Sequence, residues 1–267
     1  MFIDLIVGGC SGVISRTLTA PLELYKIQRQ NRFMPNATIR DVLNKEGFRY
    51  LWKGNFTNCT RVFPQTAINY FIFEYSQNNI FQSIDHKQTK HFLSGILGGA
   101  TSMICTYPLE TVRSRLCLQT NQSHYNGFFD AFRKIPINEQ FQGLRMSIMG
   151  FAPFSALSFT FYFQYRDWLE NSYNLNKDVL KLIGGGLAGS SAITITYPTD
   201  LIRRRLQLQN FDKNVPTYNG IIDCIRKILK REGPIGLYRG LFASYIKLFP
   251  TIGIQFLAME KLNNLLK

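Results

Sequence analysis

Pro108-Leu109-Glu110-Thr111-Val112-Arg113 is one of three versions of a single phrase in this 267-residue chain. The related stretches begin at Pro21, 87 residues earlier, and at Pro198, 90 residues later. Each phrase has an acidic residue two positions after its proline and a basic residue five positions after it. These pairs are Glu23 with Lys26, Glu110 with Arg113, and Asp200 with Arg203. Three copies at nearly equal spacing indicate three sequence repeats.

A second proline follows each of the first ones after 43 to 52 residues. The stretches that contain it are Arg61-Val62-Phe63-Pro64, Gly150-Phe151-Ala152-Pro153 and Lys247-Leu248-Phe249-Pro250. Because both landmarks recur in step, each repeat is predicted to contain two long helices. The repeats are expected to cover residues 1–83, 84–173 and 174–267.

The first helix of each repeat is predicted at Phe2 to Pro21, Phe92 to Pro108 and Val179 to Pro198. These stretches are nearly uncharged, are about long enough to cross a bilayer, and contain glycines four residues apart that let helices approach closely in lipid. The second helices are aromatic-rich and run roughly from Phe56 to Phe73, Leu144 to Phe163 and Leu241 to Met259. The sequence therefore predicts an all-α membrane protein with six transmembrane helices.

Charge is unevenly distributed along the chain, whose formal net charge is +14. Of its 31 Lys and Arg residues, 21 lie in the connections inside the repeats, at residues 26–55, 113–145 and 203–240. The positive-inside tendency places these loops on one side and both termini on the other. Their helical pattern predicts short amphipathic helices on an anionic membrane surface. The five cysteines form no CxxC pair, so no disulfide framework, metal site or cofactor is expected, and no cleavable targeting segment is visible.

Three repeats of two helices, each with a Pro-x-acid-x-x-base phrase, resemble the mitochondrial carrier family. Further marks of the family are Glu46-Gly47, Glu232-Gly233, Leu51-Trp52-Lys53-Gly54 and Leu237-Tyr238-Arg239-Gly240. The second repeat departs from them at Glu139-Gln140-Phe141-Gln142-Gly143. The resemblance implies a six-helix bundle with threefold pseudosymmetry around a water-filled cavity. It also implies that the protein lies in the membrane of a mitochondrion or a related organelle, with the basic loops in the matrix.

The resemblance further implies two gates, one at each mouth of the cavity. Pro21, Pro108 and Pro198 would kink the helices at the matrix mouth, and Gln30 and Gln207 would brace the ion pairs there, whereas Cys117 stands at the third brace position. The implied matrix pairs are Glu23 with Arg113, Glu110 with Arg203, and Asp200 with Lys26. The cytoplasmic gate is expected to be weaker, with one ion pair, Glu74 with Arg166, and one hydrogen bond, Glu260 with Gln77.

Residues that break the threefold pattern are candidates for the substrate site. Arg61, Gly150 and Lys247 occupy one position in the three repeats, and Arg16 is matched by Met103 and Ile193. Unpaired cations attract anions, arginine can hold phosphate oxygens at two points, and glycine leaves room for a flat ring. In the family that the chain resembles, the positions matching Arg61, Gly150 and Lys247 are the substrate contact points. Secondary contacts are expected from Asn69 and Phe151.

The combination of Arg, Gly and Lys resembles carriers of adenine-containing phosphates, and Ser15-Arg16-Thr17-Leu18-Thr19-Ala20-Pro21 resembles the ATP-Mg/phosphate and coenzyme A carriers. The expected function is antiport of ATP, ADP or a similar solute, with coenzyme A transport as the alternative. A non-transporting membrane scaffold and a soluble nucleic-acid-binding repeat protein are alternatives of other classes. The expected partners are a nucleotide-like anion and anionic lipid such as cardiolipin at the matrix-side helices. No nucleic acid is expected to bind, and the protein is expected to be a monomer. The histidines lack metal-ligand partners, so an enzyme is not expected.

Overall fold

The computed structural model describes residues 2–30, 47–119, 124–173, 177–210 and 215–266, and within them all side chains except those of 2–6, 177, 178, 181, 256, 260 and 263–266. All regular structure in this part of the chain is helical. The long helices are α1 (Phe2–Leu18) with α2 (Ala20–Gln30), α4 (Asn55–Tyr75), α5 (Lys87–Leu118), α8 (Leu144–Ser172), α9 (Lys177–Leu208) and α11 (Leu241–Leu266). The expected all-α fold is confirmed.

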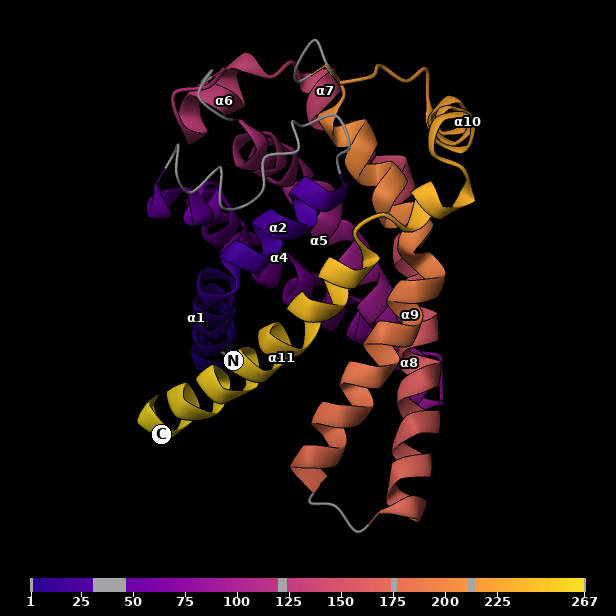
Figure 1. Ribbon diagram of the computed structural model, residues 1–267. Helices are drawn as coiled ribbons and strands as arrows, with labels where there is room; N and C mark the ends of the chain where they lie inside the picture. The colour runs from indigo at the N-terminus through magenta and orange to yellow at the C-terminus, as the bar shows by residue number, and fades with distance from the viewer. Residues whose placement is uncertain (1, 31–46, 120–123, 174–176, 211–214, 267) are drawn as a thin grey trace.

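Short helices occupy the long connections inside the repeats. They are the 3₁₀ segment η1 (Phe48–Trp52), α6 (Phe128–Lys134), α7 (Ile137–Gln140), α10 (Ile221–Glu232) and the 3₁₀ segment η3 (Pro234–Tyr238). A π-helical turn, η2 (Ser76–Ile80), ends α4. In Figure 1 α6, α7 and α10 lie at one end of the bundle, and both termini lie away from that end. This arrangement agrees with the sidedness predicted from charge.

The long helices pack as a closed ring. Within the repeats α1 contacts α4, α5 contacts α8, and α9 contacts α11. Between the repeats α4 packs along α5, α8 along α9, and α11 along α1, so the last helix of the chain meets the first. Three equivalent pairs of contacts around one ring are what three similar repeats produce. The inner faces of the helices therefore surround a common axis.

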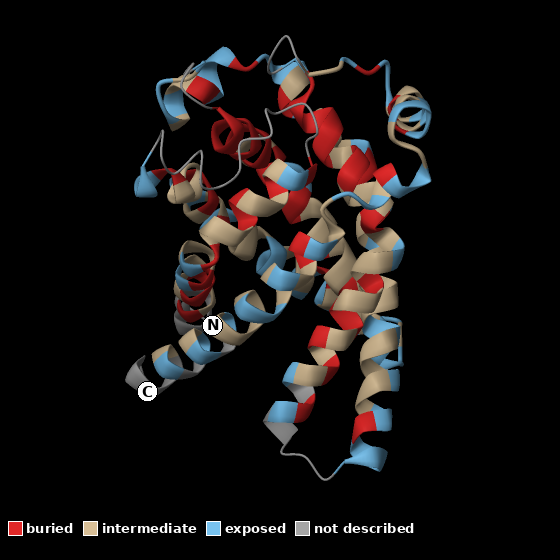
Figure 2. Cartoon of the chain, viewed as in Figure 1, coloured by how far each residue is buried: buried red, intermediate tan, exposed pale blue. Residues whose placement is uncertain are grey.

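The buried interior is unusually polar toward the end that carries the short helices, where Figure 2 shows most of the buried positions. Its largest fully buried side chains include Arg115, Gln30 and Gln207, beside Tyr107 and Tyr197. Large apolar side chains are instead exposed on the outside. They include Phe56, Phe71, Phe129, Ile222, Ile235 and Phe242. Apolar surface facing outward and charge facing inward is the distribution expected of helices in lipid.

Three described helical segments are long and apolar enough to cross a membrane by length and composition: Lys87–Leu118, Ile137–Ser172 and Pro234–Met259. The first helix of the chain is short, since α1 has only 17 residues. Helices α4 and α9 place Arg61, Gln65, Asp200 and Arg203 along the interior cavity, which lowers their mean hydropathy. These helices are polar because their inner faces line the cavity.

Two ion pairs, each made by a buried arginine, attach the short helices to the bundle. Arg115 of α5 lies 2.8 Å from Glu139 of α7, and Arg205 of α9 contacts both carboxylate oxygens of Glu232 of α10, at 2.5 and 2.9 Å. Burial of Glu232 opposes its ionisation, but the hydrogen bonds and charge of Arg205 outweigh that cost and lower its pKa. These contacts hold α7 and α10 against the ends of α5 and α9.

Candidate functional site

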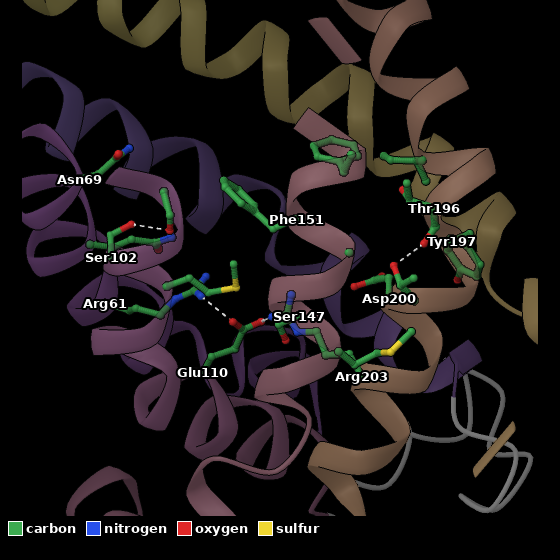
Figure 3. Close-up of a pocket in the computed structure, with 18 of the residues that line it drawn as sticks. Arg61, Asn69, Ser102, Glu110, Ser147, Phe151, Thr196, Tyr197, Asp200 and Arg203 are labelled. Atoms are coloured by element: carbon green, nitrogen blue, oxygen red, sulfur yellow. Dashed lines mark hydrogen bonds and ion pairs between the residues drawn. The ribbon is translucent and has the colours of Figure 1, made fainter. Parts of the chain in front are cut away.

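A cavity of about 470 Å³ lies inside the ring of helices. Figure 3 shows side chains of α4, α5, α8 and α9 converging on it. Four of the six predicted substrate residues line this cavity: Arg61, Asn69, Gly150 and Phe151. Four predicted gate residues line it as well: Lys26, Glu110, Asp200 and Arg203. The proposed substrate site and the proposed matrix gate are therefore one continuous surface.

All three ion pairs that the family resemblance implies at the matrix mouth are present as contacts. Lys26 Nζ lies 2.9 Å from Asp200 Oδ2, and Arg113 Nη2 lies 3.6 Å from Glu23 Oε1. Arg203 Nη2 contacts Glu110 Oε1. Each pair joins the first helix of one repeat to the first helix of another, because the acids and bases of the repeated phrase face the axis of the ring. Together the pairs connect all three repeats.

Arg61 and Lys247, the predicted substrate cations at threefold-related positions, were expected to be unpaired. Each instead contacts a carboxylate of the matrix gate. Arg61 Nη1 donates to Glu110 Oε2 at 3.0 Å, and Lys247 Nζ contacts Glu23 Oε2. Glu23 and Glu110 are therefore each shared between a gate base and a predicted substrate cation.

The third acid is not shared in this way, because Gly150 occupies the position of Arg61 and Lys247 in the second repeat. Asp200 contacts Lys26 and accepts a 3.2 Å hydrogen bond from Gln30 Nε2. Gly150 lies beside Thr199, the residue before Asp200: a β-carbon on Gly150 would overlap the Thr199 hydroxyl. The asymmetry of the sequence thus appears as an asymmetry of the ion-pair network.

Arg204 is a buried cation that the sequence reasoning missed. It is 4% exposed, lies 3.8 Å from Glu110 Oε1, and donates to Ser114 Oγ and to Gln207 Oε1. The signal was present in the run Arg203-Arg204-Arg205, of which only the first was assigned a role. Among the described residues of this network, seven cations accompany three carboxylates: Arg16, Lys26, Arg61, Arg113, Arg203, Arg204 and Lys247 with Glu23, Glu110 and Asp200. The surplus is positive.

The two predicted brace glutamines lie beside the gate pairs. Gln30 Nε2 donates to Asp200 and, at 3.1 Å, to the Tyr197 hydroxyl. Gln207 Oε1 accepts from Arg204 at 3.0 Å instead of contacting Arg203. At the third brace position the Cys117 thiol donates to the backbone carbonyl of Lys53 at 3.2 Å. Gln30 therefore contacts a gate pair directly, Gln207 contacts Arg204 beside another, and Cys117 lies next to Arg113 of the third.

Of the two contacts predicted for the cytoplasmic gate, the pair of Glu74 with Arg166 is not formed among the described residues. Arg166 pairs with Glu170 at 3.3 Å and Asp167 at 3.6 Å, both on its own helix, and Glu74 is exposed. The amide nitrogen of Gln77 is buried without a hydrogen-bond partner among the described atoms. The Glu260 side chain lies outside the described residues. Arg166 finds nearer carboxylates at the next residue and one helical turn along α8, so the expected Glu74 pair requires another arrangement of the helices.

The remaining predicted contacts differ in how closely they approach the cavity. Arg16 donates to Asn58 Oδ1 at 3.4 Å, and neither Arg16 nor Lys247 belongs to the cavity lining. Asn69 packs against α5 at Gly98, and the Phe151 ring packs against α5 at Gly99. Gln65, between Arg61 and Asn69 on the same face of α4, also lines the cavity and buries an unpartnered carbonyl oxygen. Its spacing of four residues from both neighbours could have identified it.

Gly150 offers a test of the cavity wall. Replacing Gly150 with alanine is expected to lower the free energy of unfolding by about 1–3 kcal/mol, since the new methyl group must displace Thr199. Thermal unfolding of the purified variant measures this. Gly185→Ala serves as the control because a β-carbon there meets nothing within 4 Å. Equal melting temperatures for the two variants would contradict the close contact.

Comparison with known proteins agrees with this architecture. The family model described as mitochondrial carrier protein matches residues 1–83, 85–173 and 176–267. Nearly the whole chain is matched, once per repeat. The chain belongs to the mitochondrial carrier family, whose members are transporters and not enzymes.

Individual relatives carry more specific names. The chain is 32% identical to the mitochondrial adenine nucleotide transporter ADNT1 of Arabidopsis thaliana, over 98% of this chain and 86% of the relative. It is 34% identical to mitochondrial substrate carrier family protein A of Dictyostelium discoideum, over 96% and 83%. It is 30% identical to the mitochondrial adenyl nucleotide antiporter SLC25A24 of Homo sapiens, over 98% of this chain but only 58% of the relative.

Proposed function

We propose that this carrier exchanges adenine nucleotides across the mitochondrial inner membrane by alternating access. The observation that carries the proposal is the surplus of cations around the shared carboxylates Glu23 and Glu110. A cavity with surplus positive charge and low-dielectric walls concentrates polyanions. The names of the relatives from Arabidopsis thaliana and Homo sapiens give the class of anion.

The shared carboxylates suggest how binding and opening are linked. Phosphate oxygens compete with Glu110 for Arg61 and with Glu23 for Lys247, because both kinds of oxygen accept charge-assisted hydrogen bonds. The arriving negative charge also repels the two carboxylates and attracts Arg113 and Arg203. Binding therefore weakens the pairs that close the matrix mouth, and a ligand shifts the equilibrium by as much as its affinity for the two states differs.

The base of the nucleotide is proposed to lie toward α8. Gly150 and Thr199, which pack closely together, form a flat part of the wall there, and the Phe151 ring, packed on Gly99, supplies an apolar surface. Gln65 and Asn69 of α4 supply hydrogen-bonding groups on the facing wall. Glu74, Gln77, Arg166 and Glu260 are proposed to close the cytoplasmic mouth once the matrix mouth has opened.

A thermal-shift screen tests the substrate assignment, since a ligand that binds the folded state raises its melting temperature. The purified full chain is heated with ATP, ADP, AMP, coenzyme A and inorganic phosphate, and the ligands that stabilise it are then loaded into liposomes for exchange. Stabilisation by ATP and ADP with exchange of both is expected. A response to coenzyme A alone would replace the assignment with the alternative, and a protein stabilised by all ligands that exchanges none would be a scaffold.

The short helices at the basic end of the bundle are candidates for lipid binding. We propose that a monomer binds anionic lipid such as cardiolipin at the matrix-side helices. The support is the basic series Arg226, Lys227, Lys230 and Arg231 on α10, which also exposes Ile222. Light scattering of the detergent-solubilised protein measures its mass. Heating it with cardiolipin or with phosphatidylcholine compares the two lipids, and equal stabilisation would reject the preference.

A further inference from the structure

The junction between α1 and α2 contains a backbone group that proline leaves without its helical partner. Pro21 has no N–H, so the carbonyl of Thr17, four residues earlier, loses its usual donor. The indole Nε1–H of Trp52 donates to this carbonyl at 2.9 Å. Helix α1 ends at Leu18 and α2 begins at Ala20, whereas α5 and α9 continue through Pro108 and Pro198. Trp52 therefore caps a helix break that occurs in the first repeat.

The residues at this break are also held by the first turns of α4. Asn55 Nδ2 donates to Thr17 Oγ1 at 3.1 Å, and Cys59 Sγ lies 3.6 Å from the same hydroxyl. Arg16 donates to Asn58 Oδ1 at 3.4 Å. Backbone and side chain of Thr17 are both fixed, directly beside the proposed substrate cation Arg16.

In the other two repeats the hydrogen bond runs in the opposite direction: the first helix donates it and the connection before the second helix accepts it. Tyr107 and Tyr197, the residues before Pro108 and Pro198, donate through their hydroxyls to the carbonyls of Gln142 and Arg239, at 3.0 and 2.8 Å. Their rings are parallel to those of Phe141 and Tyr238, with centroids 6.5 and 6.4 Å apart. Phe141 and Tyr238 are the counterparts of Trp52.

The first repeat lacks this tyrosine, because Ala20 precedes Pro21. In the first repeat this hydrogen bond is supplied instead by the indole N–H of Trp52, beside the apolar packing of Tyr50 on Leu24 and Ile27. The indole N–H is a donor that the ring of Phe141 cannot supply.

We propose that Trp52 is a positioning residue for the substrate site. Its hydrogen bond to Thr17 fixes the break between α1 and α2 and thereby holds Arg16 at the depth at which it meets the substrate. The inference rests on the proposed nucleotide exchange in one respect, that Arg16 contributes to the site. The position of the helix break itself does not depend on which ligand is carried.

The test uses the full chain with Trp52→Phe, which keeps a ring and removes the N–H. Loss of one hydrogen bond is expected to raise the nucleotide concentration for half-maximal exchange about 2- to 10-fold, with a smaller change in maximal rate. Tyr238→Phe, at the same position in the third repeat, is the matched control and should behave as the unaltered chain. Adding Ala20→Tyr to Trp52→Phe recreates the pair Tyr107 and Phe141 and should restore half-saturation.

Hydrogen exchange provides a readout that needs no nucleotide. In Trp52→Phe the amides of residues 18–20 should exchange faster, and Ala20→Tyr should slow them again. Unchanged exchange in this segment, or a lower melting temperature with unchanged half-saturation, would overturn the inference. If the unaltered chain responds to no nucleotide, the proposed function fails. Amide exchange then still decides the role of Trp52. If Trp52→Phe does not fold, the double variant must fold and exchange nucleotide normally for the inference to stand.

Discussion

Arg61→Ala is expected to reduce nucleotide exchange in liposomes about 100-fold, to near background, while the protein remains folded. The arginine supplies charge-assisted hydrogen bonds to phosphate, each worth about 1.5–3 kcal/mol, and alanine supplies none. Stability is expected to change less than exchange, because Glu110 keeps contacts to Arg203 and Arg204 when Arg61 is lost. Lys247→Ala should act in the same way through Glu23, which keeps Arg113.

The control for this prediction is Arg29→Ala, which removes the same charge from an exposed position at the end of α2. It should exchange nucleotide at the rate of the unaltered chain. Uptake, melting temperature and nucleotide-induced thermal shift are measured on all variants. Normal uptake by both Arg61→Ala and Lys247→Ala would refute the assigned site, whereas equal losses in all three would indicate a general effect of net charge.

Reversing the charges of Lys26 and Asp200 is expected to give the second large effect. Lys26→Asp or Asp200→Lys alone places like charges where a 2.9 Å pair stood, and should reduce exchange by at least about 10-fold, since the interrupted contact is largely buried. The double variant restores opposite charges and should recover a substantial part of the activity. This pair is the cleanest test of the matrix gate because neither partner contacts Arg61 or Lys247.

A double-mutant cycle on exchange rates gives the coupling between the two positions. A double variant whose loss of exchange equals the product of the two single losses would show that the two side chains act independently, and would remove this pair from the gate. The same reversal at Glu23 and Arg113 is a poorer test, because Lys247 also contacts Glu23. It should show weaker recovery than the pair of Lys26 and Asp200.

The architecture could be predicted because its signals are carried by local sequence. The recurring prolines at 21, 108 and 198 mark equivalent points in three helices, and the acid and base that follow each proline must face an interior, since charge is costly against lipid. Family resemblance then supplied the order in which the pairs connect, and the structure contains contacts between all three.

The network beyond those pairs depends on distances between helices, which no single stretch of sequence contains. That Arg61 reaches Glu110 follows from the packing of α4 along α5, and that Lys247 reaches Glu23 follows from the closure of α11 onto α1. Arg166 pairs with Asp167 and Glu170 on its own helix, whereas the predicted pair with Glu74 joins α8 to α4 and depends on how those helices are arranged. Which mouth is closed belongs to the arrangement of the helices and cannot be read from residue identities.

The sharing of Glu23 and Glu110 has a consequence for small inorganic anions. A chloride ion that displaces one carboxylate from Arg61 or from Lys247 exchanges one monovalent partner for another and gains little. A molecule with several linked charges can occupy both cations, on α4 and on α11, in a single binding event, and its second contact is then intramolecular. We therefore expect the protein to select polyvalent over monovalent anions, even when the monovalent ions are far more concentrated.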